Sequence, residues 1–230
     1  MFKLAVIMSQ ELFFAILYTF AFGAILATGE ILHTIMKVRT EYTRKFAHSA
    51  ASLLALTFPL IYDSYLYVLI MGAIFFVVMV VAKRKKLLMS INGVSRQTYG
   101  GVLLPVAITG AFAVSVWLND AKLFIIPILI LGVSDSLAGL TGMHFGKKVK
   151  KIIIHKLSLN KTYLGTSVFF ITALLISVYV LHWFVGNFST HTIMAAISVA
   201  VGAALVEAFS SKGLDNFTVP FTSLLILSMF

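Results

Sequence analysis

Long apolar blocks alternate with short polar segments along the whole chain of 230 residues. A helix that crosses a bilayer needs about 20 mostly apolar residues, and seven of the blocks approach or exceed that length. We therefore predict transmembrane helices at 10–32, 46–62, 64–82, 99–118, 122–145, 163–185 and 191–209. A shorter apolar tail at 214–230 contains Pro220 and is a candidate for an eighth helix that is tilted, kinked or packed inside the bundle.

The composition agrees with a membrane protein. Hydrophobic residues make up 60% of the chain and charged residues 11%, whereas a soluble domain carries about 25% charged residues. We predict an all-α fold, a polytopic transmembrane bundle of seven or eight helices in which residues 1–230 form a single integral membrane domain. The chain has no cysteine, which excludes disulfides, thiolate metal sites and cysteine nucleophiles.

The basic residues indicate the orientation in the membrane. Among the 18 lysines and arginines, all except Lys3 and Lys122 fall before the second, fourth and sixth helices and before the tail. Positively charged loops stay in the cytoplasm, so we predict an outward-facing N-terminus and a basic cytoplasmic loop at 146–162. The net charge of +10 then reflects orientation and contact with anionic lipid, not nucleic acid. A basic site for a phosphorylated ligand is the alternative.

Asp135 lies inside the apolar run 125–140. A charged residue at a helix centre costs about 2.5–3.5 kcal/mol on insertion scales, so intramembrane carboxylates are functional by default. Asp135 precedes Gly146 by 11 residues, which places it roughly 16 Å from that helix end, on the cytoplasmic half. The alternative is a structural pair with a neighbouring helix. The small residues around it allow close helix packing or leave room for a bulky ligand.

Two glycine- and lysine-containing segments are candidates for phosphate binding, because backbone N–H groups at helix ends and nearby lysines attract anions. The first contains Gly142, Gly146, Lys147 and Lys148. The second opens the sixth helix with Lys161, Thr162 and Gly165. An ordinary glycine helix end and an ordinary capped helix are the alternatives.

Further polar residues gather on the same predicted membrane face. Glu207, Asp215 and Asn216 join Asp135 there, and hard oxygen ligands beside phosphate-binding lysines describe a Mg²⁺–nucleotide site. Candidate nucleotide contacts on this face also include Arg44 and His48, which lie one helical turn apart, and Arg96. The alternative for these last three is an interface anchor or a satisfied polar group.

Taken in order, these segments resemble the polyprenol kinases, a family that includes dolichol kinases, phytol kinases and CTP-dependent diacylglycerol kinases. The resemblance covers about residues 40–230. The matching blocks are Arg44-Lys45 with His48, Asp135 through Ala138-Gly139 to Gly142 and Gly146-Lys147, Lys161-Thr162 with Gly165, and Glu207 followed by Leu214-Asp215-Asn216 and Val219-Pro220.

The resemblance implies a multi-pass enzyme that transfers the terminal phosphate of CTP, or another nucleoside triphosphate, to a lipid alcohol such as phytol, geranylgeraniol or dolichol. It implies that Lys161, Thr162 and Gly165 belong to the nucleotide-binding segment. Leu164 stands where dolichol kinases tend to carry Glu and phytol kinases a small apolar residue, which favours a kinase of short-chain prenols.

The mechanism that follows requires alignment and charge neutralisation. Asp135 or Asp215 orients or deprotonates the alcohol, and Lys161 absorbs phosphate charge. Mg²⁺ is held by the predicted ligands Asp135, Asp215, Asn216 and Glu207. The isoprenoid tail stays in lipid and enters between helices near Asp135. An active site just inside the cytoplasmic face lets a water-soluble nucleotide meet this membrane-bound alcohol. A cytidylyltransferase that forms CDP-lipids and a small membrane transporter are the alternatives.

Overall fold

The computed structural model describes the chain except residues 1, 95, 146–150 and 155–156. The predicted Gly146, Lys147 and Lys148 therefore lie outside the described residues. The helices are α1 (Phe2–Thr34), α2 (Thr40–Ala55), the 3₁₀ turn η1 (Phe58–Leu60), α3 (Leu66–Arg84), α4 (Met89–Asn92), α5 (Gly100–Trp117), α6 (Lys122–Leu129), the π-helical turn η2 (Ile130–Ser134), α7 (Asp135–Phe145), α8 (Tyr163–Val185), α9 (Thr190–Phe209) and α10 (Asp215–Leu227).

Within the described residues, six helical segments are long and apolar enough to cross a membrane, which confirms a multi-pass helical membrane protein. They are Gln10–Thr34, Leu66–Arg84, Gly100–Trp117, Lys122–Phe145, Tyr163–Val185 and Thr190–Phe209. The helices α2 and α10 have 16 and 13 residues, about 24 and 20 Å, against a hydrocarbon core of about 30 Å. The count of seven or eight spans and the outward N-terminus stay predictions.

The predicted helix at 46–62 is shorter than expected and shifted toward the N-terminus. It begins at Thr40 and ends at Ala55, and Pro59 lies in the separate 3₁₀ turn that follows. Proline has no N–H to donate to the carbonyl four residues before it and clashes with that carbonyl, which is that of Ala55, so the helix ends there. The helix also carries a polar face with Lys45, His48 and Ser49, and this face lowers its mean hydropathy below that of a membrane span.

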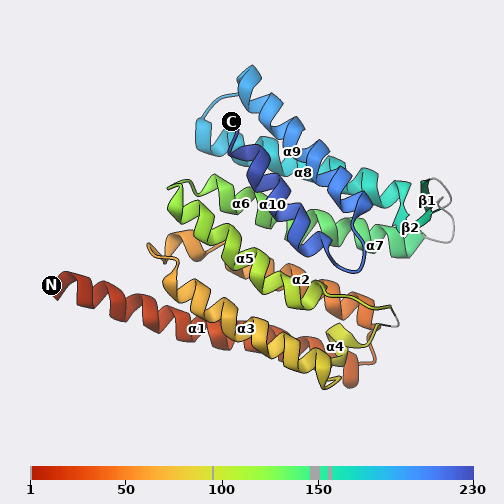
Figure 1. The fold of residues 1–230 in the computed structure, drawn as a ribbon, viewed down its shortest axis with the longest axis horizontal. Coiled ribbons are helices and arrows are strands. Elements are labelled where there is room, and N and C mark those ends of the chain that lie inside the picture. The colour runs from red at the N-terminus through yellow and green to blue at the C-terminus, as the bar shows by residue number, and fades with distance from the viewer. Residues whose placement is uncertain (1, 95, 146–150, 155–156) are drawn as a thin grey trace.

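One continuous rod, formed by α6, η2 and α7, lies in the middle of the bundle (Figure 1). The helices α1, α2, α3 and α5 lie on one side of it, and α8, α9 and α10 on the other. The segment Lys122–Phe145 is the most deeply buried of the six apolar segments. Asp135 therefore stands in the centre of the protein, between the two groups of helices.

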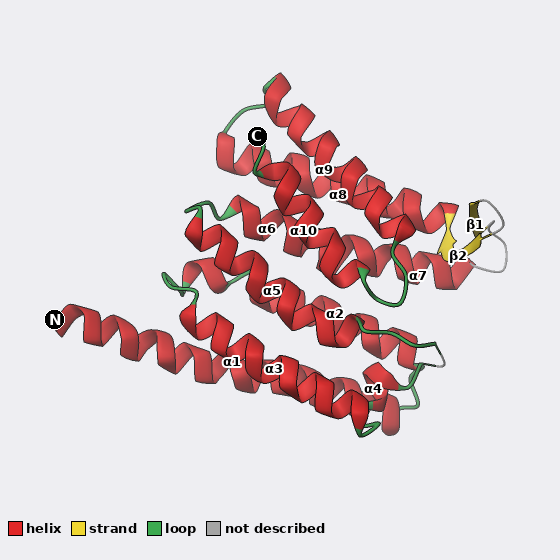
Figure 2. Cartoon of the chain, viewed as in Figure 1, coloured by secondary structure: helices red, strands yellow, loops and turns green. Residues whose placement is uncertain are grey.

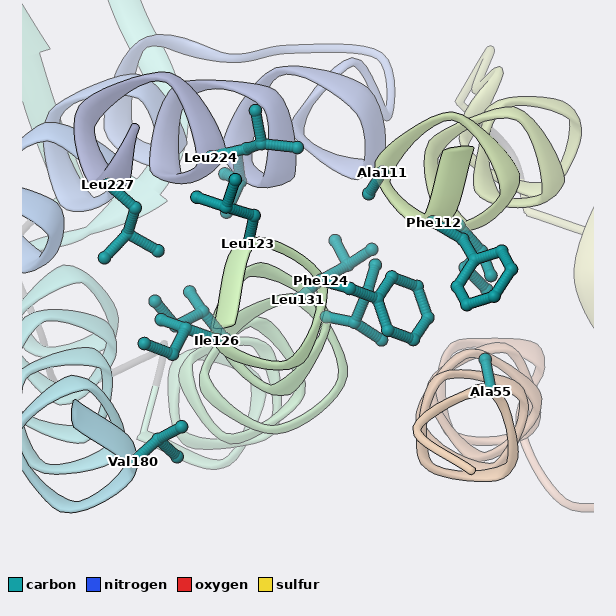
Figure 3. Close-up of a cluster of buried hydrophobic side chains, with 14 of the residues drawn as sticks. Ala55, Ala111, Phe112, Leu123, Phe124, Ile126, Leu131, Val180, Leu224 and Leu227 are labelled. Atoms are coloured by element: carbon teal, nitrogen blue, oxygen red, sulfur yellow. The ribbon is translucent and has the colours of Figure 1, made fainter. Parts of the chain in front are cut away.

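Side chains of α2, α5, α8 and α10 surround this rod (Figure 3). Phe124 and Leu131 of the rod pack beside Phe112 of α5, and Phe58 adds a ring that lies 5.7 Å from Phe112, centroid to centroid. These four side chains are at most 1% exposed. The rod is thus held firmly by apolar contacts, which fixes the position of the carboxylate that it carries.

A short antiparallel hairpin departs from the predicted all-α fold. Its strands are β1 (Lys151–Ile154) and β2 (Leu157–Thr162), and Lys151 pairs with Thr162. It forms part of the predicted basic loop at 146–162 and lies at one end of the bundle (Figure 2). The turns after α1, α3 and α9 lie at this same end, which is opposite to the N-terminus (Figure 1). This arrangement agrees with the alternation of basic segments in the sequence.

Candidate active site

The first half of the site is a buried ion pair between α2 and the central rod. The Lys45 Nζ lies 2.6 Å from the Asp135 Oδ2 and also donates to the Asp135 backbone oxygen at 2.9 Å. Only 7% of the Asp135 side chain and 12% of the Lys45 side chain are exposed. A buried charge requires a partner and hydrogen bonds, and Lys45 supplies both. We call this the Lys45–Asp135 centre.

The polar face of α2 also binds the π-helical turn that precedes Asp135. The His48 Nε2 donates to the Leu131 oxygen at 2.8 Å, and the Ser49 Oγ donates to the Gly132 oxygen at 2.9 Å. Turns of this type are frequent at functional sites, and here the side chains of α2 hold the turn. The His48 Nε2 also lies 3.4 Å from the Asp135 Oδ2. His48 thus positions Asp135, and its predicted contact with a nucleotide stays a prediction.

Two glycines of the rod make room for these contacts. A Cβ atom on Gly139 would lie 2.6 Å from the Lys45 Cε, and one on Gly132 would lie 2.6 Å from the Ser52 Cβ. Real Cβ atoms do not approach other heavy atoms so closely. The small residues that the sequence analysis singled out around Asp135 therefore allow α2 to approach and its lysine to reach the carboxylate.

The second half of the site joins β2, α9 and α10. The Lys161 Nζ lies 2.5 Å from the Glu207 Oε1 and 2.9 Å from the Asp215 Oδ2. Thr166 of α8 donates to the other Glu207 oxygen at 3.3 Å. The Glu207 side chain is 3% exposed, whereas those of Lys161 and Asp215 are 21% and 16% exposed. We call this the Lys161–Glu207–Asp215 centre.

Electrostatics connects the two centres. Burial alone would lower the pKa of Lys161, but the carboxylates of Asp215, Glu207 and Asp135 outweigh burial and raise it above its ordinary value. Lys161 therefore stays protonated throughout the physiological pH range. Because the Asp135 charge contributes to this rise, the two centres lie close enough to influence one another.

The predicted glycine-rich segments meet beside the second centre. Thr162 caps α8, and its Oγ1 accepts from the Gly165 N–H at 3.1 Å. A Cβ atom on Gly165 would lie 3.1 Å from the Ala138 oxygen, and one on Gly142 would lie 3.4 Å from the Thr162 Oγ1. The glycines thus bring α7 close to the start of α8. This places the described part of the first phosphate-binding segment next to the second.

Asn216 is placed differently from the other predicted metal ligands. Its Nδ2 donates to the Gly100 oxygen at 2.8 Å, so it joins α10 to the beginning of α5. Gly213 has a φ of +81°, and a Cβ there would lie 2.5 Å from the Gly100 N. These contacts fix the loop that precedes Asp215. Asn216 therefore supports the position of its neighbour.

Arg44 and Arg96 meet at a shared partner, which the sequence did not indicate. The Nη2 atoms of Arg44 and Arg96 lie 2.8 and 3.4 Å from the two Glu41 oxygens. Burial would raise the pKa of Glu41, but the two guanidinium groups lower it overall. The Arg44 Nε is buried without a hydrogen-bond partner in the described structure, and Arg96 is half exposed. This Glu41 cluster keeps free donors for an anion.

An apolar cavity extends from the Lys45–Asp135 centre between α1, α2, α3 and α5. The space inside it that the centre of a water molecule can occupy is about 100 Å³, so the cavity is narrow. Its charged lining residues are Arg44, Lys45 and Asp135, all toward one end, and its other lining residues are mostly apolar. Such a cavity suits a molecule with one polar end.

The predicted magnesium ligands are divided between the two centres. Asp135 is paired with Lys45, while Glu207 and Asp215 both face the ammonium of Lys161. In the described residues no three His, Asp or Glu side chains form a metal-binding group. Magnesium is usually held by one or two carboxylates together with substrate phosphates. Glu207 and Asp215, whose oxygens already surround one cationic group, fit that requirement.

Sequence reasoning did not identify Lys45 as a partner of Asp135. The two residues are 90 positions apart, and lysines near a predicted helix end are usually interfacial anchors. The polar spacing of Lys45, His48 and Ser49 on one face of α2 is the signal that would have found the contact. A polar face on a helix in the membrane must meet polar groups of another helix.

Comparison with known proteins agrees with the resemblance seen in the sequence. No family model matches the chain, and no solved structure matches it. The chain is similar to the phytol kinase of Synechocystis sp., with 28% identity over 208 residues, which cover 89% of this chain and 85% of that enzyme. The match extends over most of the length of both proteins and so confirms that this chain resembles the polyprenol and phytol kinases.

Proposed function

We propose that this protein is a lipid-alcohol kinase that transfers the terminal phosphate of CTP, or of another nucleoside triphosphate, to a prenol such as phytol, geranylgeraniol or dolichol. The observation that carries the proposal is the juxtaposition of two lysine–carboxylate centres. The Lys45–Asp135 centre lies at the polar end of an apolar cavity. The Lys161–Glu207–Asp215 centre lies beside the capped start of α8.

In the proposed reaction the hydroxyl oxygen of the alcohol attacks the terminal phosphorus. A new oxygen–phosphorus bond forms, the bond to the β-phosphate oxygen breaks, and the nucleoside diphosphate leaves. Asp135 accepts or orients the hydroxyl proton, and Lys45 holds the carboxylate in place through two contacts. A positioned base of this kind typically contributes about 10²–10⁴-fold to the rate.

Lys161 and the basic segments bind the phosphates. An ammonium has three N–H donors, and Lys161 uses two of them on Glu207 and Asp215. The third remains for a phosphate oxygen. We assign Glu207 and Asp215 as the residues that hold Mg²⁺ with the nucleotide. When bound, the ion neutralises charge on the transferring phosphate.

The proposal is tested with purified protein in liposomes, each nucleoside triphosphate being combined with each candidate alcohol. We expect phosphate transfer to the alcohol, dependence on Mg²⁺ and release of CDP when CTP is the donor. Release of pyrophosphate would indicate a cytidylyltransferase instead. Flux of a solute without nucleotide turnover would indicate a transporter. The absence of nucleotide consumption with any prenol or diacylglycerol would overturn the kinase proposal.

We further propose that the active site faces the cytoplasm, as the basic segments favour. The chain has no cysteine, so single cysteines can be introduced without background. A cysteine at Lys85, in the turn after α3, should resist an impermeant thiol reagent in intact cells. A cysteine at Asn187, in the turn after α8, should react. The reverse labelling pattern would contradict this orientation.

A further inference from the structure

The apolar cavity beside the Lys45–Asp135 centre has one closed end that is made of aromatic rings. Phe58 lines it at that end and is itself 1% exposed. Its ring lies 5.7 Å from Phe112 and 6.2 Å from Phe124, measured between centroids. Arg44 and Lys45 at the charged end belong to α2, and Phe58 belongs to the segment that follows it, so the cavity runs along this helix.

We propose that this cavity holds the hydrocarbon chain next to the hydroxyl of the lipid alcohol, and that the aromatic end at Phe58 limits how much of the chain enters. The proposal rests on the proposed kinase function and adds to it the place and the length of the bound chain. It replaces the expectation that the tail stays entirely in lipid. The occupant has one polar group because Lys45, Asp135 and Arg44 meet at only one end.

The dimensions of the cavity set the length of chain. It is lined from Met71 to Met79 on α3 and from Gly101 to Thr109 on α5, which is about 12 Å in each case at the helical rise per residue. An extended chain advances about 3.5 Å for every three bonds, so about ten bonds fit. One isoprene unit contributes about four bonds to a chain of this kind. The cavity therefore holds two to three isoprene units, and longer chains pass into lipid between the helices.

Selection of the chain must come from shape. Lipid tails are as apolar as leucine side chains, so a prenol gains no hydrophobic energy when it leaves the bilayer for an apolar cavity. Whether a chain is accepted depends on the space that the walls leave. Substitutions that change this space should consequently change the preference among alcohols, while the response to nucleotide and Mg²⁺ stays the same.

Ala51 provides the sharpest test. It lines the cavity six residues after Lys45, about 9 Å along α2, which is beyond the first isoprene unit. Ala51→Leu should lower kcat/KM at least tenfold for geraniol, farnesol and geranylgeraniol. For the five-carbon alcohol with a single isoprene unit, kcat/KM should stay within twofold of the wild-type value. The matched control is Ala24→Leu, because Ala24 is exposed on α1 and does not line the cavity. The control should retain the wild-type preference.

Phe58→Leu tests the closed end. The smaller side chain deepens the cavity, so the ratio of kcat/KM for geranylgeraniol to that for geraniol should rise at least threefold, with an unchanged KM for the nucleotide. Equal losses with the single-unit alcohol and the longer ones in Ala51→Leu, or unchanged ratios in both variants, would overturn the cavity proposal and leave the kinase intact. Failure of wild-type turnover with every alcohol would instead overturn the kinase.

Binding can also be followed without turnover. A geranylgeraniol derivative with a diazirine on its second isoprene unit should label α3 or α5 residues that line the cavity, such as Met71 or Ile108. Ala51→Leu should reduce this labelling at least fivefold, and Ala24→Leu should not. Labelling that is confined to the lipid-exposed faces of the helices, or that Ala51→Leu leaves unchanged, would refute the proposal.

Discussion

The two lysine–carboxylate centres differ in charge balance and in surroundings. Lys45 faces one carboxylate, Asp135, and the pair is deeply buried beside an apolar cavity. Lys161 faces two carboxylates, Glu207 and Asp215, and is more accessible at the end of the bundle that carries the basic segments. The first centre has one carboxyl group for its lysine, and the second has two.

This difference fits a kinase in which the first centre binds the alcohol and the second binds the metal ion and the nucleotide. Burying a neutral ion pair beside hydrocarbon costs less free energy than burying an unpaired charge. The Lys45–Asp135 centre therefore needs no further counter-ion before the alcohol binds. A surplus carboxylate attracts a divalent cation and, with it, a triphosphate. Asp135 also contributes to the raised pKa of Lys161, so the two centres interact electrostatically.

The largest effect should come from the Lys45–Asp135 centre. Asp135→Asn keeps size and polarity but removes the group that accepts or orients the hydroxyl proton. We expect kcat to fall about 10²–10⁴-fold. The Asn oxygen can still accept from Lys45, but the ammonium loses its counter-charge and the protein should be less stable, so the amount of protein in the membrane is measured together with the rate. Asp120→Asn, in the turn before α6, is the control and should keep activity. Normal turnover by well-expressed Asp135→Asn would remove Asp135 from the site.

Removing one carboxylate of the second centre should change the response to metal. For Asp215→Asn we expect the Mg²⁺ concentration at half-maximal rate to rise by at least about 10–100-fold, because loss of a partner that only orients a ligand already weakens metal binding by that much. Excess Mg²⁺ should partly restore the rate. Titration of Asp135→Asn, measured at its residual rate, should show an unchanged Mg²⁺ requirement. If the two variants had the same Mg²⁺ requirement, metal binding would not be specific to the Lys161–Glu207–Asp215 centre.

Loss of the lysine in the second centre should weaken nucleotide binding. A charge-assisted hydrogen bond contributes about 1.5–3 kcal/mol, or roughly 10–100-fold in affinity. For Lys161→Ala the KM for the nucleotide should therefore rise more than kcat falls, while the KM for the alcohol stays the same. A fall in kcat alone would assign Lys161 to the transferring phosphate instead of to binding.

The smallest effect should come from substitution of Gly139, which packs against the Lys45 side chain. In Gly139→Ala the new methyl group displaces the flexible end of Lys45, and we expect kcat to fall by roughly two- to tenfold, as for a modest misplacement of a catalytic group. Gly23→Ala is the matched control, because a Cβ there meets nothing within 4 Å. If both variants have wild-type kcat, the contact between Lys45 and Asp135 does not affect the chemistry.

The sequence predicted most helices to within a few residues, because the length of an apolar span is fixed by the bilayer. The segments predicted at 99–118 and 191–209 correspond to Gly100–Trp117 and Thr190–Phe209. The predicted helix at 122–145 is correct in extent, but the π-helical turn before Asp135 was not expected. A single widened turn depends on contacts from α2, and hydropathy carries no signal for those.

The candidate site could be predicted only in part. Asp135, Lys161, Glu207 and Asp215 were recognisable because charged groups in apolar surroundings are rare and costly. Their grouping was not: the sequence placed the acidic residues in one metal site, whereas the structure pairs Asp135 with Lys45. Linear spacing within one helix gives no information on which lysine of another helix reaches a carboxylate.

By itself the sequence determined that this protein is a multi-pass membrane bundle with most of its lysines and arginines near one end, since hydropathy and charge act on each segment separately. The tertiary structure decided which groups meet. Lys45 and Asp135 are joined across 90 residues, and Lys161 and Asp215 across 54. The cavity likewise exists only where α1, α2, α3 and α5 come together, because its shape is set by the packing of side chains from separate helices.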